Sequence, residues 1–564
     1  MAGLIKQTVN GKSYYYAIET KRGNGQPRVV SKKYLGKLED IVRKVKEPPQ
    51  PTSVKSREFG LTAALLSISD KIGFVKLVDD VIVKRNQGAT IGQYMLVAAF
   101  NRCSSPTSKS RIGEWYDWTI LPRLQKIEPK HLTSQRFWDN MDLITEDEVV
   151  ELQVALVKRI VEIYRVDLKV LLFDATNFFT YIDTNNTCTL PQRGHNKQKR
   201  NDLRQIGLAL MVSRDGGVPL FFDVYQGNES DPVEFDHFIR KLIGRFNDIF
   251  AACNDLTVVC DKGNNSKKNL ELVDKSPFHF IASLSPSHAK NLLQIPLEQY
   301  QGCRSNRLED EKYYVTREKV FAIERTVISV FNPALLQGQL QGIHNNLAKT
   351  QKVLNLLQEK LIAWKSPGRK GGKKPTVASV DKQVKRILSR QHMKTLIRYT
   401  VQEVDNKWID LQYNIDKEAF DELQKSYLGK TILFTDRDDW PAEEVILAYR
   451  DQYKIEHNFR QMKDPSWVSW DPLLHWTDQK IRVHAFYCFA ALLMSSLLKR
   501  ELHKQKISMS LSRVFESLSR IQEVTIVYPS PKRSLEPCKV VMLTEMDKEQ
   551  KVLFDALGLG QYIV

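Results

Sequence analysis

Length, composition and charge set the first limits on this protein. With 564 residues the chain is too long for one compact core, and at about 150 residues per domain it divides into roughly three or four units. Its 42% hydrophobic and 27% charged residues are typical of a soluble globular protein. The 84 Lys and Arg against 66 Asp and Glu give a net charge of +18, which favours a polyanionic partner, above all nucleic acid. A basic enzyme without such a partner is the alternative.

Cysteine usage and hydropathy exclude several classes of protein. The seven cysteines include no Cys-x-x-Cys pair, which argues against a disulfide framework or a zinc finger and is typical of a reducing cytoplasm. The N-terminal residues lack the apolar core of a secretion signal. The most apolar run, residues 483–498, contains His484 and is shorter than the roughly 20 residues of a bilayer span. We therefore predict a buried helix there, no membrane association and a cytoplasmic location.

The first 165 residues predict a short β region followed by a helical region. Strand-like segments at 13–18 and 28–31 flank a Gly-rich turn, which predicts an N-terminal β-hairpin within residues 1–50. From 51 to 165 apolar residues recur three and four positions apart, and this spacing is typical of helices.

Periodicity changes at Val166 and predicts an α/β unit. Its expected strands are 167–173, 206–212, 218–225, 256–260 and 278–284, and its expected helices are 233–246 and 267–273. The order β-β-β-α-β-α-β indicates a mixed α/β sheet in which three strands precede the first helix.

Between 290 and 429 this order breaks. The segment holds strand-like pieces, a long helical run at 333–364 and a basic, Gly-rich tract at 365–375. The tract lacks the terminal Lys-Ser/Thr of a phosphate-binding loop, so we expect no nucleotide site. It is either a solvated turn between two helices or a loop that contacts DNA phosphates. A strand at 431–435 and a helix at 442–463 then restore the α/β character.

Two aspartates stand at the ends of apolar predicted strands: Asp174 follows Phe173, and Asp261 follows Cys260. Functional groups gather at the carboxyl edge of α/β sheets, because strands deliver side chains there with little freedom. A single Asp that ends a strand is common without any function. Two of them, separated by two strands and a helix, are more informative, since this connectivity can place their strands side by side.

A third carboxylate lies on the predicted helix at 442–463. At about 100° per residue, one stripe of this helix is polar. The stripe consists of Tyr449, Gln452, Glu456, Arg460 and Lys463. A second, apolar stripe lies next to it, displaced by one residue around the helix axis. Glu456 therefore lies at the border of the face that packs on the sheet, where its carboxylate can reach inward to a metal. The alternative is a surface Glu that pairs weakly with Arg460.

Three clustered carboxylates suit a divalent metal. Mg²⁺ prefers oxygen ligands and takes a few carboxylates together with water and phosphate oxygens. Two such ions about 4 Å apart can activate the attacking oxygen and stabilise the leaving oxygen during in-line displacement at phosphorus. Without metal, the carboxylates would repel one another. No arrangement of His and Cys in the sequence offers a competing zinc site.

Four segments of the chain carry a family resemblance. They are 171–176 around Asp174, 194–197, 258–266 around Asp261, and Tyr449, Gln452, Glu456 and Lys463 in the spacing Y-x2-Q-x3-E-x6-K. In this order they resemble a DDE transposase of a prokaryotic insertion sequence, of the branch with a Y-x2-R-x3-E-x6-K signature. Gln452 replaces the Arg of that signature, which would be expected to bind DNA phosphate, and keeps the capacity for hydrogen bonding without the charge.

The resemblance implies the architecture. It implies an α/β fold with a ribonuclease-H-like mixed sheet core at 166–289 and 430–500, interrupted by an inserted α+β domain at 290–429. From its position in the chain, the helical N-terminal region at 51–165 is expected to bind DNA ends or dimerise, and we assign no chemistry to 501–564.

The resemblance also implies the chemistry. Asp174, Asp261 and Glu456 would be the catalytic residues and would hold two Mg²⁺ or Mn²⁺ ions, with Asp174 shared between them. The partners would be double-stranded DNA, both the terminal inverted repeats and the target, bound by a homodimer in the nucleoid of a prokaryotic cytoplasm.

Further candidates for DNA contact lie in and outside the signature. Beside Tyr449, Gln452, Arg460 and Lys463 they are Lys197, Arg200 and Trp408. The basic loop 195–204 either lines the DNA channel or is a solvated loop. Trp408 either stacks on an unpaired base or packs the small domain that contains it.

Two rival functions stay open. One is a metal-dependent nuclease of the same fold, which hydrolyses DNA but never joins a 3′ end to a target. The other is a non-catalytic DNA-binding protein derived from a transposase, for which decayed carboxylates would be the mark. All three carboxylates are present, and a simple nuclease has no need of a large inserted domain.

Overall fold

The computed structural model describes residues 2–564 except 24–25, 47–49, 86, 184–185, 197, 251–254, 262, 264–265, 365–373, 406–407 and 530–536. The chain forms two compact units. The first consists of Met1–Ser67, Ser110–Leu132 and Glu501–Val564, and the second of Ile68–Lys109 and Thr133–Arg500.

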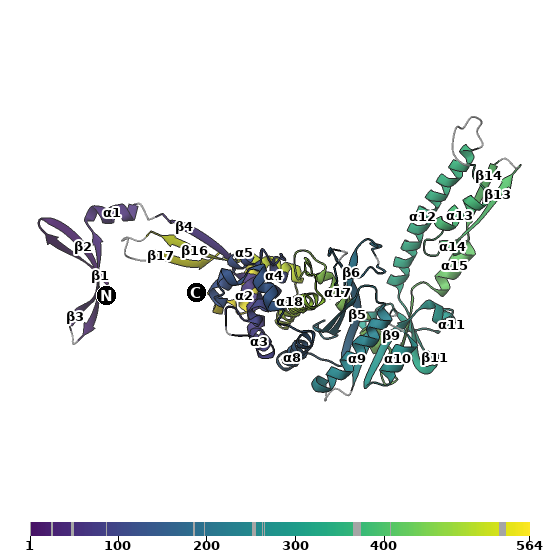
Figure 1. Cartoon of the computed structure of the whole chain (residues 1–564), viewed down its shortest axis with the longest axis horizontal. Helices are drawn as coiled ribbons and strands as arrows, with labels where there is room; N and C mark the ends of the chain where they lie inside the picture. The colour runs from purple at the N-terminus through teal and green to yellow at the C-terminus, as the bar shows by residue number, and fades with distance from the viewer. Residues whose placement is uncertain are drawn as a thin grey trace. The chain divides into compact units, whose positions relative to one another are not determined.

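A nine-stranded mixed sheet forms the centre of the second unit (Figure 1). Its order is β10-β11-β12-β15-β9-β8-β5-β6-β7, with β8 parallel to both β5 and β9 and the other pairs antiparallel. The strands are β5 (Val170–Thr180), β6 (Arg204–Ser213), β7 (Pro219–Gln226), β8 (Leu256–Cys260), β9 (Phe278–Leu284), β10 (Gln301–Gly302), β11 (Lys312–Val320), β12 (Ile323–Phe331) and β15 (Lys430–Thr435). The predicted order from the first strand to β9 is confirmed, as is the mixed α/β sheet.

Helices cover both faces of this sheet. On one face Phe173 of β5 packs against Phe235 and Phe238 of α9 (Asp231–Phe250), with ring centroids 5.1 and 5.0 Å apart. On the other face α16 (Ala442–Arg450) contacts β8 and β9, and α17 (Tyr453–Met462) contacts β5 and β6. Successive strand residues point to opposite faces, so Asp174, next to Phe173, faces α16 and α17.

Two predicted boundaries differ from the structure. The first strand was expected to end at Phe173, but β5 continues to Thr180, because β6 still pairs with it after its pairing with β8 stops at Leu172. The helix expected at 442–463 is two helices, α16 and α17, separated at Asp451 and Gln452.

The remaining helices of the second unit pack on the sheet or on one another. They include α3 (Phe74–Val81), α4 (Ile91–Ser104), α7 (Ser134–Met141), α8 (Glu146–Tyr164), α10 (Lys267–Asp274), α11 (Lys290–Leu293) and α18 (Asp478–Lys504). Within the described residues α18 is the one helix long and apolar enough to cross a membrane, yet 89% of its most apolar window is buried inside the protein. This agrees with the prediction of a buried helix at 483–498.

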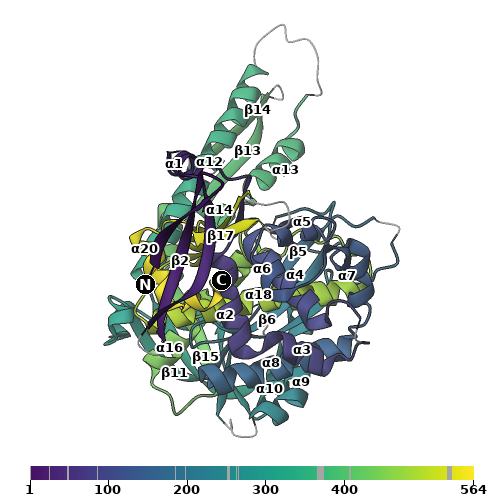
Figure 2. The ribbon, with the colours of Figure 1, turned by 90° about the vertical axis from the view of Figure 1, so that its left-hand side faces the viewer.

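The predicted insertion at 290–429 divides into two parts. β10, β11 and β12 extend the main sheet. Residues 332–429 lie outside the sheet, between Phe331 at the end of β12 and Lys430 at the start of β15, and these two residues are paired across the strands. The second part contains α12 (Pro333–Ala363), α13 (Val377–Ile387), α14 (Met393–Leu396), β13 (Ile397–Val404), β14 (Trp408–Ile415) and α15 (Lys417–Ser426). These elements pack on a separate buried cluster that includes Leu354, Val380, Met393 and Leu396. Figures 1 and 2 show α12 alongside the β13–β14 hairpin.

The first unit holds two small sheets. One is β1 (Ala2–Val9), β2 (Lys12–Gly23) and β3 (Gln26–Gly36), followed by α1 (Leu38–Lys46). The other joins β4 (Ser53–Glu58), β16 (Gln522–Tyr528) and β17 (Cys538–Leu543). The other helices here include α2 (Gly60–Ile72), which continues into the second unit, α5 (Ile112–Asp117), α6 (Leu121–Gln125), α19 (Leu511–Ser519) and α20 (Lys548–Ala556). The N-terminal sheet has three strands, one more than the predicted hairpin, and the additional strand is β1. The turn Asn10-Gly11, a strong hairpin signal, joins this strand to β2.

Candidate active site

Asp174 and Asp261 lie at the same level on neighbouring strands. The parallel register of β5 and β8 pairs Val170 with Thr257 and ends with Leu172 opposite Val259. Asp174 lies two residues after Leu172, and Asp261 lies two residues after Val259. Because neighbouring strands are about 4.8 Å apart, this register brings the two carboxylates together on the face that α16 and α17 cover.

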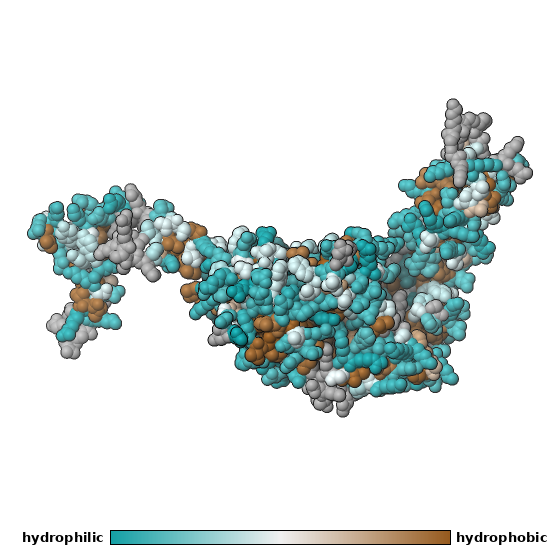
Figure 3. All heavy atoms as spheres, in the orientation of Figure 1, coloured by the Kyte–Doolittle hydropathy of each residue, from teal (hydrophilic) through white to brown (hydrophobic). Residues whose placement is uncertain are grey.

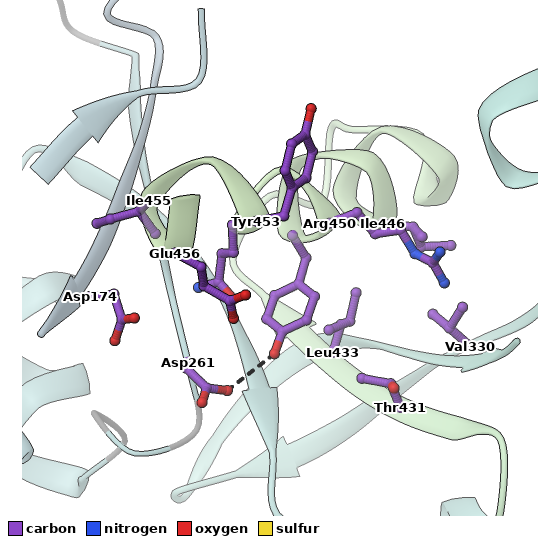
Figure 4. A pocket seen from close by; sticks show the side chains of 12 residues that line it. Asp174, Asp261, Val330, Thr431, Leu433, Ile446, Arg450, Tyr453, Ile455 and Glu456 are labelled. Carbon is purple, nitrogen blue, oxygen red and sulfur yellow. Dashed lines mark hydrogen bonds between the residues drawn. The ribbon is translucent and has the colours of Figure 1, made fainter. Parts of the chain in front are cut away.

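Glu456 reaches the same place from α17. It lines a cavity of about 350 Å³ together with both aspartates (Figure 4). Its side chain is exposed, and it forms no ion pair with Arg460 or with any other residue that the structure describes. The cavity lining is Asp174, Asp261, Val330, Thr431, Leu433, Ile446, Tyr449, Arg450, Gln452, Tyr453, Ile455 and Glu456. The structure therefore brings the three predicted carboxylates to one cavity, with Glu456 unpaired.

Two hydroxyls orient Asp261. The Tyr449 hydroxyl lies 3.2 Å from Asp261 Oδ1 (dashed in Figure 4) and 2.9 Å from Ser283 Oγ, and Ser283 Oγ donates to the same carboxylate oxygen at 3.2 Å. Burial, and then the charge of Asp261, raise the pKa of Tyr449 above its usual value, so its hydroxyl stays protonated and can donate. Ser283, near the end of β9, carried no sequence signal beyond its place at a strand end.

The site is electrostatically negative. Burial raises the pKa of the Cys260 thiol to about 12, and the carboxylates of Asp261 and Asp174 add to this effect. In the part of the chain that the structure describes, no three His, Cys, Asp or Glu side chains lie close enough together to hold one ion. The donor set of the cavity nevertheless fits a hard divalent cation, since the described side chains that line it include three carboxylates and neither His nor Cys. Phosphate oxygens and water would complete the coordination of such an ion.

A buried ionic network fixes the start of α17. Asp451, only 1% exposed, pairs with Arg214 at 2.6 Å, with Arg307 at 2.7 Å and with Lys454 at 3.2 Å. Burial alone would raise the pKa of Asp451, but these three cations outweigh it and hold that pKa below its usual value. Asn458 donates from the same helix to the carbonyl of residue 217 at 2.9 Å. These contacts tie the helix that carries Glu456 to the β6–β7 turn and to the segment before β11. Except for the Asp451–Lys454 pair, these contacts join residues far apart in the chain, so no local sequence signal predicts them.

The other signature residues lie at or beside the cavity. Lys463 donates to Thr176 Oγ1 at 2.5 Å, two residues beyond Asp174 on the same face of β5. Gln452 lines the cavity, and its buried Nε2 has no hydrogen-bond partner among the described residues. Arg460 is exposed on α17.

The remaining predicted DNA contacts lie outside the cavity lining. Arg200 is half-exposed and pairs with Asp202 at 2.7 Å, in a loop held by the buried side chain of Asn196. Trp408 is half-buried at the start of β14. Lys197 lies outside the described residues, as does most of the basic tract at 365–375.

Comparison with known proteins gives one family match. A family model described as the transposase DDE domain matches residues 167–494, which include Asp174, Asp261 and Glu456. No curated protein matches the chain. One solved structure similar to it is a cryo-EM structure of the piggyBac transposase synaptic complex with hairpin DNA, at 8% sequence identity and a TM-score of 0.38. That similarity covers 81% of this chain and 79% of the other.

Proposed function

Because the chain belongs to the transposase DDE domain family, we propose that it cleaves DNA at the ends of a mobile element and joins the freed ends to target DNA. One observation supports this most directly. Asp174 and Asp261 stand level on adjacent parallel strands, and Glu456 lines the same cavity without an ion pair among the described residues.

The topology supports a ribonuclease-H-like core. In β7-β6-β5-β8-β9, three antiparallel strands are followed by two strands parallel to β5. Residues 332–429, which leave and re-enter the sheet at the paired residues Phe331 and Lys430, would be a domain inserted before Glu456. The insertion then lengthens the chain between Asp261 and Glu456 but does not separate the two side chains in space, since both line the same cavity.

The proposed chemistry is two displacements at phosphorus. First, a water oxygen bonds to phosphorus at the element end and the bond to the 3′ oxygen breaks, which leaves a 3′-hydroxyl. Next, that hydroxyl oxygen bonds to a target phosphorus, its proton passes to solvent, and a target 3′ oxygen leaves. A divalent cation, Mg²⁺ or Mn²⁺, would supply Lewis-acid chemistry at the scissile phosphate.

The residues of the chain provide the geometry for these steps. Asp174, Asp261 and Glu456 would hold two such ions. Tyr449 and Ser283 orient Asp261 through its Oδ1, so that one carboxylate oxygen is fixed. The Lys463 ammonium beside β5 would neutralise a DNA phosphate, since it is exposed and adjacent to the site.

The finer assignments form part of the same proposal. The chain would come from a prokaryotic insertion sequence of the Y-R-E-K branch and act in the cytoplasm on the nucleoid. Its DNA partners would be terminal inverted repeats and target DNA, held by a homodimer, because two element ends must be joined together. Residues 51–165 would take part in end binding or dimerisation.

A strand-transfer experiment tests the proposal. Purified protein is mixed with labelled duplex that carries the flanking ends of its own gene, in Mg²⁺ or Mn²⁺, beside a Glu456→Gln control. Joined products that disappear in the control support the transposase. Nicking without joining would assign the chain to the hydrolytic nucleases, and binding with neither reaction would assign it to the non-catalytic DNA-binding proteins.

A further inference from the structure

The N-terminal sheet carries an unusual share of the positive charge. Residues 1–46 contain eleven Lys and Arg against three Asp and Glu, a net +8 out of the +18 of the whole chain. These residues form β1, β2, β3 and α1, none of which belongs to the catalytic sheet. In Figure 3 this part of the surface is mainly hydrophilic, with small separate hydrophobic patches.

The strand register places four of these cations on the same face of the sheet. Lys6 stands opposite Tyr15, residue 17 opposite Lys33, and Lys21 opposite Arg28. Since alternate residues of β2 share a face, four cations lie on one face of the sheet. We name this surface, Lys6, Lys21, Arg28 and Lys33, the cationic face. Of the three acids in residues 1–46, only Glu19 lies on it.

The cationic face is open. All four of its cations are exposed, and none forms an ion pair within the described part of the chain. The opposite face differs, because Tyr16 and Tyr34 pack there at 5.3 Å between ring centroids and Lys32 lies 4.3 Å above the Tyr16 ring. The opposite face also carries exposed lysines, Lys12 and Lys32, but Lys32 lies over an aromatic ring there, whereas the four cations of the cationic face have no such contact among the described residues.

The size and chemistry of the cationic face fit duplex DNA. Three strands place Lys6 and Lys33 about 10 Å apart across the sheet, and the six residue steps from position 15, opposite Lys6, to Lys21 separate the two ends of the face by about 20 Å. The major groove is about 12 Å wide, and β-sheets are among the elements that enter it. Single-stranded nucleic acid is the poorer fit, because aromatic stacking platforms accompany the charge in such sites, whereas the register places only Tyr15 on the cationic face and Tyr14, Tyr16 and Tyr34 on the other.

We propose that the cationic face of the N-terminal sheet is a docking surface for double-stranded DNA, separate from the catalytic cavity. This inference rests on the proposed function, because it takes the polyanion to be the DNA on which the catalytic unit acts. The docked duplex is either the element end or any flanking DNA, since both present the same phosphate backbone.

The test measures duplex binding by the full-length chain carrying Glu456→Gln, so that cleavage does not interfere. Lys21→Gln with Lys33→Gln removes two charges from the cationic face. The matched control, Lys12→Gln with Lys32→Gln, removes two exposed lysines from the opposite face of the same sheet. Each protein is titrated with an element-end duplex and with an unrelated duplex of equal length, at several salt concentrations.

The cationic-face variant is expected to bind roughly tenfold more weakly at physiological salt, and to lower the salt slope by about two, because two phosphate contacts are lost. Lys21→Arg with Lys33→Arg is expected to restore binding. A loss on both duplexes supports backbone contact, and a loss on the element end alone supports docking of that end.

Unchanged binding would overturn the inference, and so would an equal loss in the opposite-face control. A changed oligomeric state with unchanged affinity would assign the face to self-association and overturn it as well. Failure of the proposed function is a separate result: no strand transfer by the unsubstituted chain, whatever the effect of the lysine variants on binding.

Discussion

The hydroxyl of Tyr449 offers the sharpest test of the candidate site. It lies 3.2 Å from Asp261 Oδ1, and Tyr449→Phe removes this donor while keeping the ring. A hydrogen bond to a charged group contributes about 1.5–3 kcal/mol, and loss of a group that orients a metal ligand lowers metal affinity about 10–100-fold. Because 3.2 Å is long for such a bond, we expect the lower end of this range. The expected effect is about tenfold, or about 1.4 kcal/mol.

The assay is strand cleavage as a function of Mg²⁺ or Mn²⁺ concentration. Tyr449→Phe is expected to raise the half-maximal metal concentration about tenfold and to leave the rate at saturating metal near that of the unsubstituted chain. Ser283→Ala removes the other hydroxyl on the same oxygen and is expected to shift the midpoint in the same direction.

Tyr453→Phe is the matched control for this measurement. Tyr453 lines the same cavity, but it is 58% exposed and its ring points away from Asp261 (Figure 4). An unchanged metal midpoint in Tyr449→Phe, at unchanged thermal stability, would refute the reasoning. An equal shift in Tyr453→Phe would also refute it, since the effect would then not come from the orientation of Asp261.

Three further predictions concern the support of the site, its DNA contact and its core. Asp451→Asn is expected to lower the free energy of unfolding by about 3 kcal/mol, because it removes one partner of a buried ionic network, and to reduce strand transfer. Glu444→Gln, which removes a 41%-exposed partner of the same Arg214, is expected to cost at most about 1 kcal/mol by thermal unfolding; an equal loss would contradict the role given to burial. Lys463→Gln is expected to lower the salt slope of DNA binding by about one without changing thermal stability, and an unchanged slope would remove Lys463 from the DNA contacts. Burial, and then Asp223, raise the pKa of Glu234 from 4.5 to about 9, so the folded state binds a proton there that the unfolded state has lost, and stability falls as pH rises between these values. Glu234→Gln is expected to reduce this fall in a melting series from pH 5 to 9, and parallel curves for both proteins would contradict the assignment.

The sequence predicts one ideal helix that carries the signature residues, whereas the structure has two helices, α16 and α17. The helix is interrupted at Asp451 and Gln452, where the Asp451 carboxylate is buried among Arg214, Arg307 and Lys454. Gln452 consequently lies at the cavity with a buried amide nitrogen that has no described partner. Helical periodicity assumes an unbroken helix, and the contacts of Asp451 with Arg214 and Arg307, which are distant in the chain, leave no local trace in the sequence.

The sequence alone determined the order of the strands and helices from β5 to β9. Alternating and continuous apolar runs predicted β5 to β9 and the helices between them, and the ends of two apolar runs located Asp174 and Asp261. These signals are local, because backbone preference and hydrophobic periodicity act between residues a few positions apart.

Tertiary structure alone decided which residues share the cavity and what holds them. The register of β5 with β8 sets Asp174 level with Asp261, the hydroxyls of Tyr449 and Ser283 converge on Asp261 Oδ1, and β11 and β12 join the main sheet instead of a separate domain. Each of these contacts joins strands or side chains that are distant in the chain. Their pairing depends on the packing of the whole sheet and its covering helices, which no window of the sequence contains.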